Sequence, residues 1–247
     1  MDGGSDSAVN IQSRGEGGMD PDLSSRRESC IIETASGVSL DARVYRGKGS
    51  EVAVVLVHPY SVLGGFQGLM KGIAMGLAAR GFTSLTFNMR GVGNSTGRSS
   101  LTGSSEVEDV VAVCQWASRH LPTSRILLVG SSAGAAIAGS AVDEVEEVVG
   151  YVGIGYPFGW TASILLGRHQ KGILQSRKPK LFVMGTRDGF TSVSQLHNKL
   201  LDTWNSQTHL VDGVSHFQME GPAFDAQMVD LISQFIHNHF ITTPTCA

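Results

Sequence analysis

Cysteine, charge and long apolar runs are scarce in this sequence, and each scarcity argues against a class of protein. The 247 residues contain three cysteines, Cys30, Cys114 and Cys246, which lie far apart. Their odd number and wide spacing favour reduced thiols over a disulfide framework or a cysteine metal cluster. Charged residues make up 17% of the chain and hydrophobic residues 41%, a balance that favours a well-buried core over disorder.

The sequence also lacks basic clusters and segments that enter membranes. Its formal net charge is −3 and it has no block of lysine or arginine, so we do not expect nucleic acid as a partner. No apolar run approaches the ~18 residues of a membrane span. The N-terminal region has no signal-peptide apolar core, and its scattered acidic residues argue against a transit peptide. We therefore expect a cytoplasmic protein without a membrane span.

The chain divides into a tail and one domain. Residues 1–27 are polar, rich in glycine, serine and aspartate and without periodicity, which predicts a flexible N-terminal tail. Residues 28–247 contain no internal repeat and no linker, so we expect a single domain there. This domain opens with an alternating pattern about Ser36 and Gly37 that predicts a hairpin.

Short apolar runs alternate with helical patterns along the rest of the domain. The runs that predict strands cover residues 52–57, 83–87, 126–130, 150–155, 181–185 and 208–211. Amphipathic helical patterns cover residues 65–81, 104–121 and 225–240. In the second of these helices, Ser105 and Glu108 have the spacing of a capping box. The alternation predicts an α/β fold whose mostly parallel central sheet is covered by helices on both faces.

Two segments match G-x-S-x-G, the pattern of a strained strand-to-helix turn that exposes a serine nucleophile. They are GNSTG, around Ser95, and GSSAG, around Ser132. The turn requires a buried strand directly before it and a helix directly after it. The run ILLV leads straight into GSSAG and a helical pattern of small residues follows, whereas GNSTG has neither neighbour. We predict Ser132 as the nucleophile; the alternative is a Gly/Ser connection without chemistry.

A serine hydroxyl is a weak nucleophile at neutral pH, so Ser132 requires a histidine base and a carboxylate that orients this base. In a parallel sheet such residues follow the carboxyl ends of later strands. Asp188 lies three residues beyond one strand-like run, and His216 lies five residues beyond the next. Asp212 is a rival acid, but it lies only four residues before His216 on the same segment. We therefore predict Ser132, Asp188 and His216 as a catalytic triad.

Acyl transfer also requires N–H donors that stabilise the oxyanion. One donor is expected from Ala133, the residue after the nucleophile, and the second from the loop that follows an earlier strand. This loop reads HPYSVLGGF. Pro59 has no N–H, so we predict Tyr60 as the second donor, with Ser61 next, and we expect His58 to brace the loop.

Five segments, HPYSVLGG, NMRGVGNSTG, GSSAG, GTRDG and GVSHF, resemble the α/β-hydrolase superfamily in sequence and in order. The resemblance is closest to its small serine hydrolases without a cap, which carry an HPH-type loop followed by RGVGxSxG, and it covers residues from about 29 to 240. It implies an α/β-hydrolase fold with a minimal cap or none, and it places Ser95 in a loop near the site. Pro59-Tyr60 departs from the family pattern, in which His-Gly followed by an aliphatic or aromatic residue is commoner.

The segment in which many lipases and epoxide hydrolases insert a helical lid is short in this chain. Only twenty residues, 161–180, separate GYPFGW from the next strand-like run. We therefore expect a pocket that is open or covered by one short helix. The apolar candidates for the rim of this pocket are Tyr60, Tyr156, Phe158 and Trp160, and Ser61 is a further candidate for the pocket.

Together these features predict a serine hydrolase that cleaves an ester or related acyl bond of a small molecule through an acyl-enzyme intermediate. Carboxylesterase is the leading activity, followed by thioesterase and small peptidase, and no metal or organic cofactor is implied. Two alternatives stay open: a ligand receptor or scaffold that retains the triad with slow or no turnover, and a hydroxynitrile lyase that uses the same three residues. Turnover without a protein partner separates the enzyme from the receptor.

Overall fold

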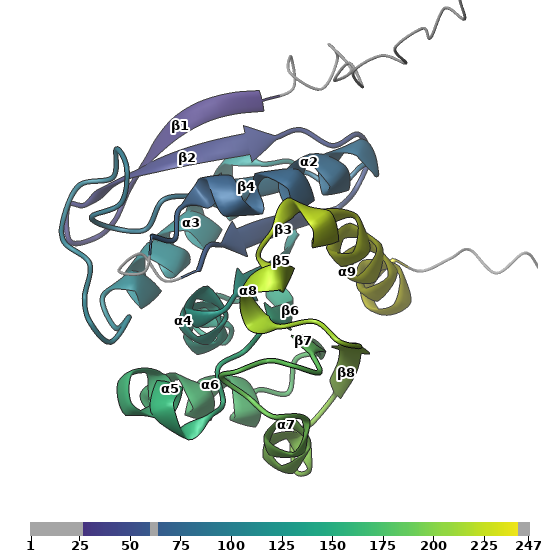
Figure 1. Ribbon diagram of the computed structural model, residues 1–247. Helices are drawn as coiled ribbons and strands as arrows, with labels where there is room; N and C mark the ends of the chain where they lie inside the picture. Colours follow the sequence, from purple (N-terminus) through teal and green to yellow (C-terminus); the bar gives the residue numbers. More distant parts are fainter. Residues whose placement is uncertain (1–26, 60–63, 242–247) are drawn as a thin grey trace, which may run out of the picture.

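The computed structural model describes residues 27–59 and 64–241, which form an eight-stranded sheet flanked by helices (Figure 1). The strands are β1 (Arg27–Glu33), β2 (Ser39–Tyr45), β3 (Val52–Val57), β4 (Ser84–Phe87), β5 (Arg125–Ser131), β6 (Val148–Ile154), β7 (Lys180–Gly185) and β8 (Ser206–Val211). The α-helices are α2 (Lys71–Ala79), α3 (Glu106–His120), α4 (Ala133–Ala141), α5 (Trp160–Leu166), α6 (Gln170–Gln175), α7 (Val193–Leu200), α8 (His216–Met219) and α9 (Asp225–Phe240). Short 3-10 helices are η2 (Gln67–Met70), η3 (Gly167–His169) and η4 (Pro222–Phe224).

The order of the strands in the sheet is β1-β2-β4-β3-β5-β6-β7-β8. β1 and β2 form the predicted antiparallel hairpin, and β2 is also antiparallel to β4. All pairs from β4 to β8 are parallel, which confirms the mostly parallel sheet. The carboxyl ends of β5, β7 and β8 therefore lie at the same edge of the sheet, where a parallel α/β fold builds its site.

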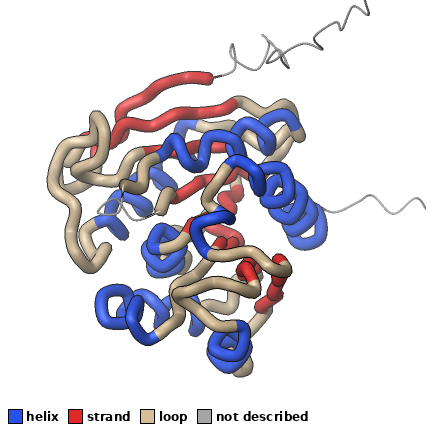
Figure 2. The backbone as a smooth tube through the Cα atoms, viewed as in Figure 1, coloured by secondary structure: helices blue, strands red, loops and turns tan. Residues whose placement is uncertain are grey.

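Helices cover both faces of the sheet, which explains why its central strands are apolar along their whole length. Successive side chains of a strand point to opposite faces. In β3, Val54 packs in the core layer formed with α2 and α9, whereas Val55 packs in the layer formed with α3 and α4. Figures 1 and 2 show α2 beside α9 on one side of the sheet.

Helix α3 begins where the sequence pattern predicts it, but without the predicted capping box. Ser105 makes no capping hydrogen bond with its side chain. The carboxylate of Glu108 instead accepts hydrogen bonds from the backbone N–H of Ser36 and from the Arg90 guanidinium, both at 2.8 Å. The capping-box prediction is wrong because tertiary partners on the hairpin turn and on the loop after β4 bind this carboxylate.

The N-terminal tail predicted for residues 1–27 lies outside the described residues, except for Arg27, which is the first residue of β1. Within residues 27–59 and 64–241, none of the helices combines the length and the apolar character needed to cross a bilayer.

Candidate active site

The predicted nucleophile lies at a strained turn between β5 and α4. β5 ends at Ser131 and α4 begins at Ala133, so Ser132 alone connects them. Its backbone angles are φ 54° and ψ −125°, and non-glycine residues rarely adopt a positive φ. Strain of this kind is concentrated at functional sites. The backbone at Ser132 is therefore that of a turn that exposes a serine nucleophile.

Two flanking glycines make this turn possible. A Cβ atom at Gly134 would overlap the backbone carbonyl of His58, and one at Gly130 would lie 2.5 Å from the carbonyl oxygen of Gly134. Neither position has room for a side chain, because the first turn of α4 is in direct contact with the backbone that follows β3, at Gly134, and with the end of β5, at Gly130. The spacing G-x-S-x-G around Ser132 is thus a steric requirement of this turn.

Ser132, His216 and Asp188 form a continuous hydrogen-bonded chain. Oγ of Ser132 lies 2.7 Å from Nε2 of His216, and Nδ1 of His216 lies 2.6 Å from Oδ2 of Asp188. The side chains of His216 and Asp188 are 4% and 0% exposed. A carboxylate only accepts hydrogen bonds, so Nδ1 carries the imidazole proton and Nε2 accepts from the serine hydroxyl. The structure thus brings together all three residues of the predicted triad.

The loop after β7 orients Asp188. Its Oδ1 accepts hydrogen bonds from the backbone N–H groups of Phe190, at 2.7 Å, and Thr191, at 2.9 Å, which leaves Oδ2 for the histidine. The rival acid, Asp212, is exposed, and its Oδ1 accepts from the Thr186 hydroxyl at 3.1 Å. The acid that contacts the histidine is therefore Asp188.

Aromatic rings and a short helix hold the imidazole of His216. His216 begins α8, and the side chain of Gln218 accepts a hydrogen bond from the backbone N–H of Ser215 at 2.8 Å, which fixes the start of this turn. The imidazole makes edge contacts with the rings of Phe190 and Phe217, at centroid distances of 4.5 and 5.4 Å. These contacts restrict rotation of the ring about its side-chain bonds.

One predicted oxyanion donor is at the expected place, and the other is not described. Ala133 is the first residue of α4, and the first N–H groups of a helix have no acceptor within the helix. Its N–H therefore lies directly beside the nucleophile, where an oxyanion donor is needed. Tyr60 and Ser61 lie outside the described residues.

His58 braces the loop after β3, as expected from the sequence. Its side chain is fully buried, Nε2 accepts a hydrogen bond from the backbone N–H of Met89 at 3.1 Å, and Nδ1 donates to the carbonyl oxygen of Pro59 at 2.6 Å. Burial lowers the pKa of His58 to about 4. The ring is therefore neutral near pH 7, and both of its nitrogens are bound to backbone groups.

Ser95, in the second G-x-S-x-G segment, has a structural role. Its hydroxyl donates to the carbonyl oxygen of Asn88 at 2.7 Å and accepts from the backbone N–H of Asp41 at 2.9 Å. The segment is a loop after β4, in which Gly93 and Gly97 both have positive φ. Ser95 thus ties this loop to β2, and neither of its two partners is a histidine.

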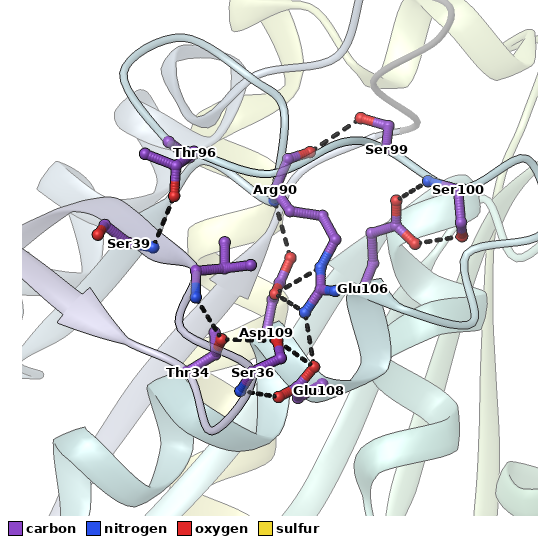
Figure 3. Close-up of polar contacts among 12 residues, drawn as sticks. Thr34, Ser36, Ser39, Arg90, Thr96, Ser99, Ser100, Glu106, Glu108 and Asp109 are labelled. Carbon is purple, nitrogen blue, oxygen red and sulfur yellow. Dashed lines mark hydrogen bonds and ion pairs between the residues drawn. The ribbon is translucent and has the colours of Figure 1, made fainter.

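An ion-pair network holds the same loop on the start of α3 (Figure 3). The guanidinium of Arg90 binds Oδ1 of Asp109 through Nε at 2.9 Å and Nη2 at 2.7 Å, and it binds Glu108 at 2.8 Å. Farther along the loop, the backbone N–H of Ser100 donates to Glu106 at 2.6 Å. The carboxylates in the first turn of α3 thus fix the conformation of the RGVGNSTG segment.

Two of the residues predicted at the pocket rim are core residues. Tyr156 and Phe158 are 2% and 3% exposed, stack with a centroid distance of 4.1 Å, and pack against Phe182 of β7. The rim prediction is wrong for both because their rings fill the core layer next to β7. Trp160, by contrast, is 77% exposed at the start of α5.

A residue that the sequence patterns did not single out, Glu220, lies beside the triad. Its Oε1 is 3.7 Å from Nε2 of His216, and its side chain lines a cavity of about 100 Å³ together with Ser132. The sequence feature that could have identified Glu220 is its position four residues after His216, because this spacing places two side chains on one face of a helical turn.

Solved structures share this fold over most of the chain. A serine hydrolase homologue from Coxiella burnetii is 26% identical, with a TM-score of 0.68, and the match covers 85% of this chain and 96% of that one. A serine hydrolase without a lid from Xanthomonas campestris is 22% identical, with a TM-score of 0.72 and coverages of 89% and 97%. An esterase from Pyrococcus furiosus is also 22% identical, with a TM-score of 0.72 and coverages of 92% and 98%. Because the last two structures are only 22% identical to this chain, they show the shared fold alone.

Comparisons of sequence give a curated relative and a family. An uncharacterised 31.7 kDa protein of Escherichia coli, from the traX-finO intergenic region, is 31% identical over 121 residues, which are 46% of this chain and 40% of that protein. This chain thus spans less than half the length of the curated relative it matches. The family model of the X-Pro dipeptidyl-peptidases (S15 family) matches residues 36–210. Together with the capless α/β-hydrolase fold, this match shows that the chain belongs to the S15 family of the α/β-hydrolase superfamily.

Proposed function

We propose that this protein is a serine hydrolase that cleaves an ester or related acyl bond of a small molecule. The observation that carries the proposal is the chain of hydrogen bonds from Ser132 through His216 to Asp188, with distances of 2.7 and 2.6 Å. It joins a strained nucleophile to a base whose tautomer is fixed by a buried acid.

In the acylation step, Oγ of Ser132 attacks the carbonyl carbon of the substrate while Nε2 of His216 takes the hydroxyl proton. The N–H of Ala133 stabilises the oxyanion that forms, and we propose Tyr60 as the second donor. The resulting imidazolium carries a proton on each nitrogen and is stabilised by Asp188 through Nδ1. Nε2 then gives its proton to the leaving group, and the acyl group stays on Ser132.

In the deacylation step, water attacks the acyl carbon and loses a proton to the same Nε2. The bond between this carbon and Oγ of Ser132 then breaks, and Nε2 returns the proton to Oγ. The acid product leaves and the resting chain of hydrogen bonds forms again. Each step thus uses Nε2 first as an acceptor and then as a donor.

Carboxylesterase is the activity we favour. Between β6 and β7 the chain forms only α5, η3 and α6, so there is no large cap domain in the described part of this segment. An open site suits small esters. Small peptidase is the second candidate, and the match to the X-Pro dipeptidyl-peptidase family favours it.

Turnover by the purified protein, without any protein partner, tests the proposal. We expect the wild type to hydrolyse 4-nitrophenyl acetate, and Ser132→Ala to lose several orders of magnitude in rate. Ser95→Ala is the matched control, since it changes the other serine with the same sequence pattern. A parallel assay with an X-Pro dipeptide anilide decides between esterase and peptidase. No turnover of either substrate class by a folded wild type would contradict an enzyme and favour a receptor.

A further inference from the structure

A second carboxyl group lies on the open side of the catalytic histidine. Oδ2 of Asp188 accepts a hydrogen bond from Nδ1 of His216 at 2.6 Å, and Oε1 of Glu220 lies 3.7 Å from Nε2 of the same ring. Glu220 follows α8 at the residue that ends this helical turn. The imidazole is thus flanked by two carboxyl groups, one at each nitrogen.

The carboxyl group of Glu220 has an unusual environment. Its Oε1 is buried and has no hydrogen-bond partner within residues 27–59 and 64–241. Burial raises the pKa of Glu220, and the neighbouring His216 and Ser132 oppose this shift only in part. A buried acceptor without a partner costs folding free energy, and such groups in native proteins call for an explanation such as a catalytic role or a bound water.

The space next to this oxygen is suited to water. The cavity that Glu220 lines together with Ser132 has a volume of about 100 Å³, and a water molecule occupies roughly 30 Å³ in the liquid. A water oxygen about 2.8 Å from each atom would bridge Oε1 of Glu220 and Nε2 of His216, which lie 3.7 Å apart. The bridging position lies beside the serine oxygen that carries the acyl group.

We propose that Glu220 is a positioning residue that orients the hydrolytic water in the deacylation step. The inference rests on the proposed serine-hydrolase function. In the acyl-enzyme Oγ of Ser132 is esterified, so it no longer donates a hydrogen bond to Nε2. The water then donates one hydrogen to Nε2 of His216 and the other to Oε1 of Glu220, and a lone pair on its oxygen is left to attack the acyl carbon. Nε2 takes the first proton as the water oxygen bonds to the acyl carbon, the bond from this carbon to Oγ then breaks, and Nε2 returns the proton to Oγ. Glu220 only accepts a hydrogen bond throughout.

Acylation has its own contact with the base. Before acylation, Oγ of Ser132 lies 2.7 Å from Nε2 of His216, so the nucleophile reaches its base directly, although the Ser132 hydroxyl also interacts with the Glu220 carboxyl group. The loss of Glu220 should therefore slow one step of the reaction and spare the other. A purely structural role would slow both.

Stopped-flow hydrolysis of 4-nitrophenyl acetate separates the two steps, because nitrophenolate is released on acylation. Glu220→Leu introduces an apolar side chain of similar size and removes the acceptor, whereas Glu220→Gln keeps a carbonyl oxygen. We expect Glu220→Leu to show a burst of one nitrophenolate per site and a deacylation rate about 10–100-fold lower, since small misplacements of a reacting group have effects of this size. We expect kcat and KM to fall together while kcat/KM is kept, and Glu220→Gln to recover part of the rate. Intact-protein mass spectrometry should show an accumulated acetyl group on Glu220→Leu.

Glu146→Leu is the matched control, because Glu146 is exposed and precedes the amino end of β6, at the opposite edge of the sheet. Thermal unfolding shows whether each variant is folded. If Glu220→Leu does not fold, Glu220→Gln alone must show slower deacylation with unchanged kcat/KM. Unchanged deacylation, or an equal loss in both steps, overturns the proposal while leaving the triad mechanism in place. A wild type that forms no acyl-enzyme on Ser132 overturns both.

Discussion

Replacement of Asp188 by asparagine tests how the acid fixes the tautomer of His216. In the wild type, Oδ1 of Asp188 accepts from two backbone N–H groups, at 2.7 and 2.9 Å, and Oδ2 accepts from Nδ1–H at 2.6 Å. An asparagine has one oxygen and one NH₂ group for these two positions. Either its oxygen or its NH₂ group must face the histidine.

The two backbone donors decide this orientation. If the amide NH₂ faced Phe190 and Thr191, two partly buried N–H groups would lose their acceptor, at about 1–3 kcal/mol each. The oxygen therefore stays with the backbone, and the orientation that mimics aspartate is at most about a few per cent populated. The NH₂ group then donates to Nδ1 of His216, which moves the imidazole proton to Nε2. In this tautomer Nε2 cannot accept the proton of Ser132.

We expect Asp188→Asn to lower kcat/KM for an ester by roughly 10⁴-fold, which corresponds to about 5.5 kcal/mol of transition-state stabilisation. Circular dichroism and thermal unfolding should show a folded protein. Asp212→Asn is the matched control, and it should keep most of the activity because its carboxylate binds Thr186 instead of His216. A loss of less than about tenfold in Asp188→Asn, or an inactive but folded Asp212→Asn, would refute this reasoning.

Three further predictions concern the structure around the site. Ser95→Ala should lower the free energy of unfolding by about 1–3 kcal/mol, since it leaves the buried N–H of Asp41 and the carbonyl of Asn88 without this partner. Denaturant unfolding measures this loss, and the rate of ester hydrolysis per folded molecule should stay at the wild-type level. Deletion of residues 2–25, a polar segment, should change the melting temperature little, and a loss of several degrees would show that this segment packs on the domain. In the folded state the pKa of His58 is lowered from 6.5 to about 4, so the unfolded chain binds the proton more readily than the folded chain. The free energy of unfolding should therefore fall by about 3 kcal/mol as the pH falls from 6.5 to 4. Denaturant unfolding across this range, with His58→Gln as the comparison, should show a flatter pH dependence for the variant.

Much of the fold was predictable from local sequence, because the determining interactions are local. β3 was predicted residue by residue, since a short apolar run buried on both faces has few other interpretations. The strained turn at Ser132 was predictable because its glycines are needed where two backbones meet. Asp188 and His216 followed from one rule, that sites lie at the carboxyl ends of parallel strands.

The errors and omissions come from tertiary contacts. The capping box at Glu108 failed because its carboxylate binds Arg90, 18 residues away in the sequence, instead of its own helix terminus. Tyr156 and Phe158 follow a buried strand and turn back into the core, which an aromatic-rich sequence does not reveal. Glu220 was missed because a single glutamate one turn after a histidine is common on helix surfaces, and its burial becomes visible only when α8 packs on the site.

The central claim is that Ser132 is a nucleophile activated by His216. Labelling with a fluorophosphonate, followed by peptide mapping, tests this claim most directly. We predict one covalent adduct, on Ser132 within the segment of residues 130–134, in the wild type and in Ser95→Ala, and none in Ser132→Ala. An adduct on Ser95 or Ser131, or labelling that persists in Ser132→Ala, would contradict it.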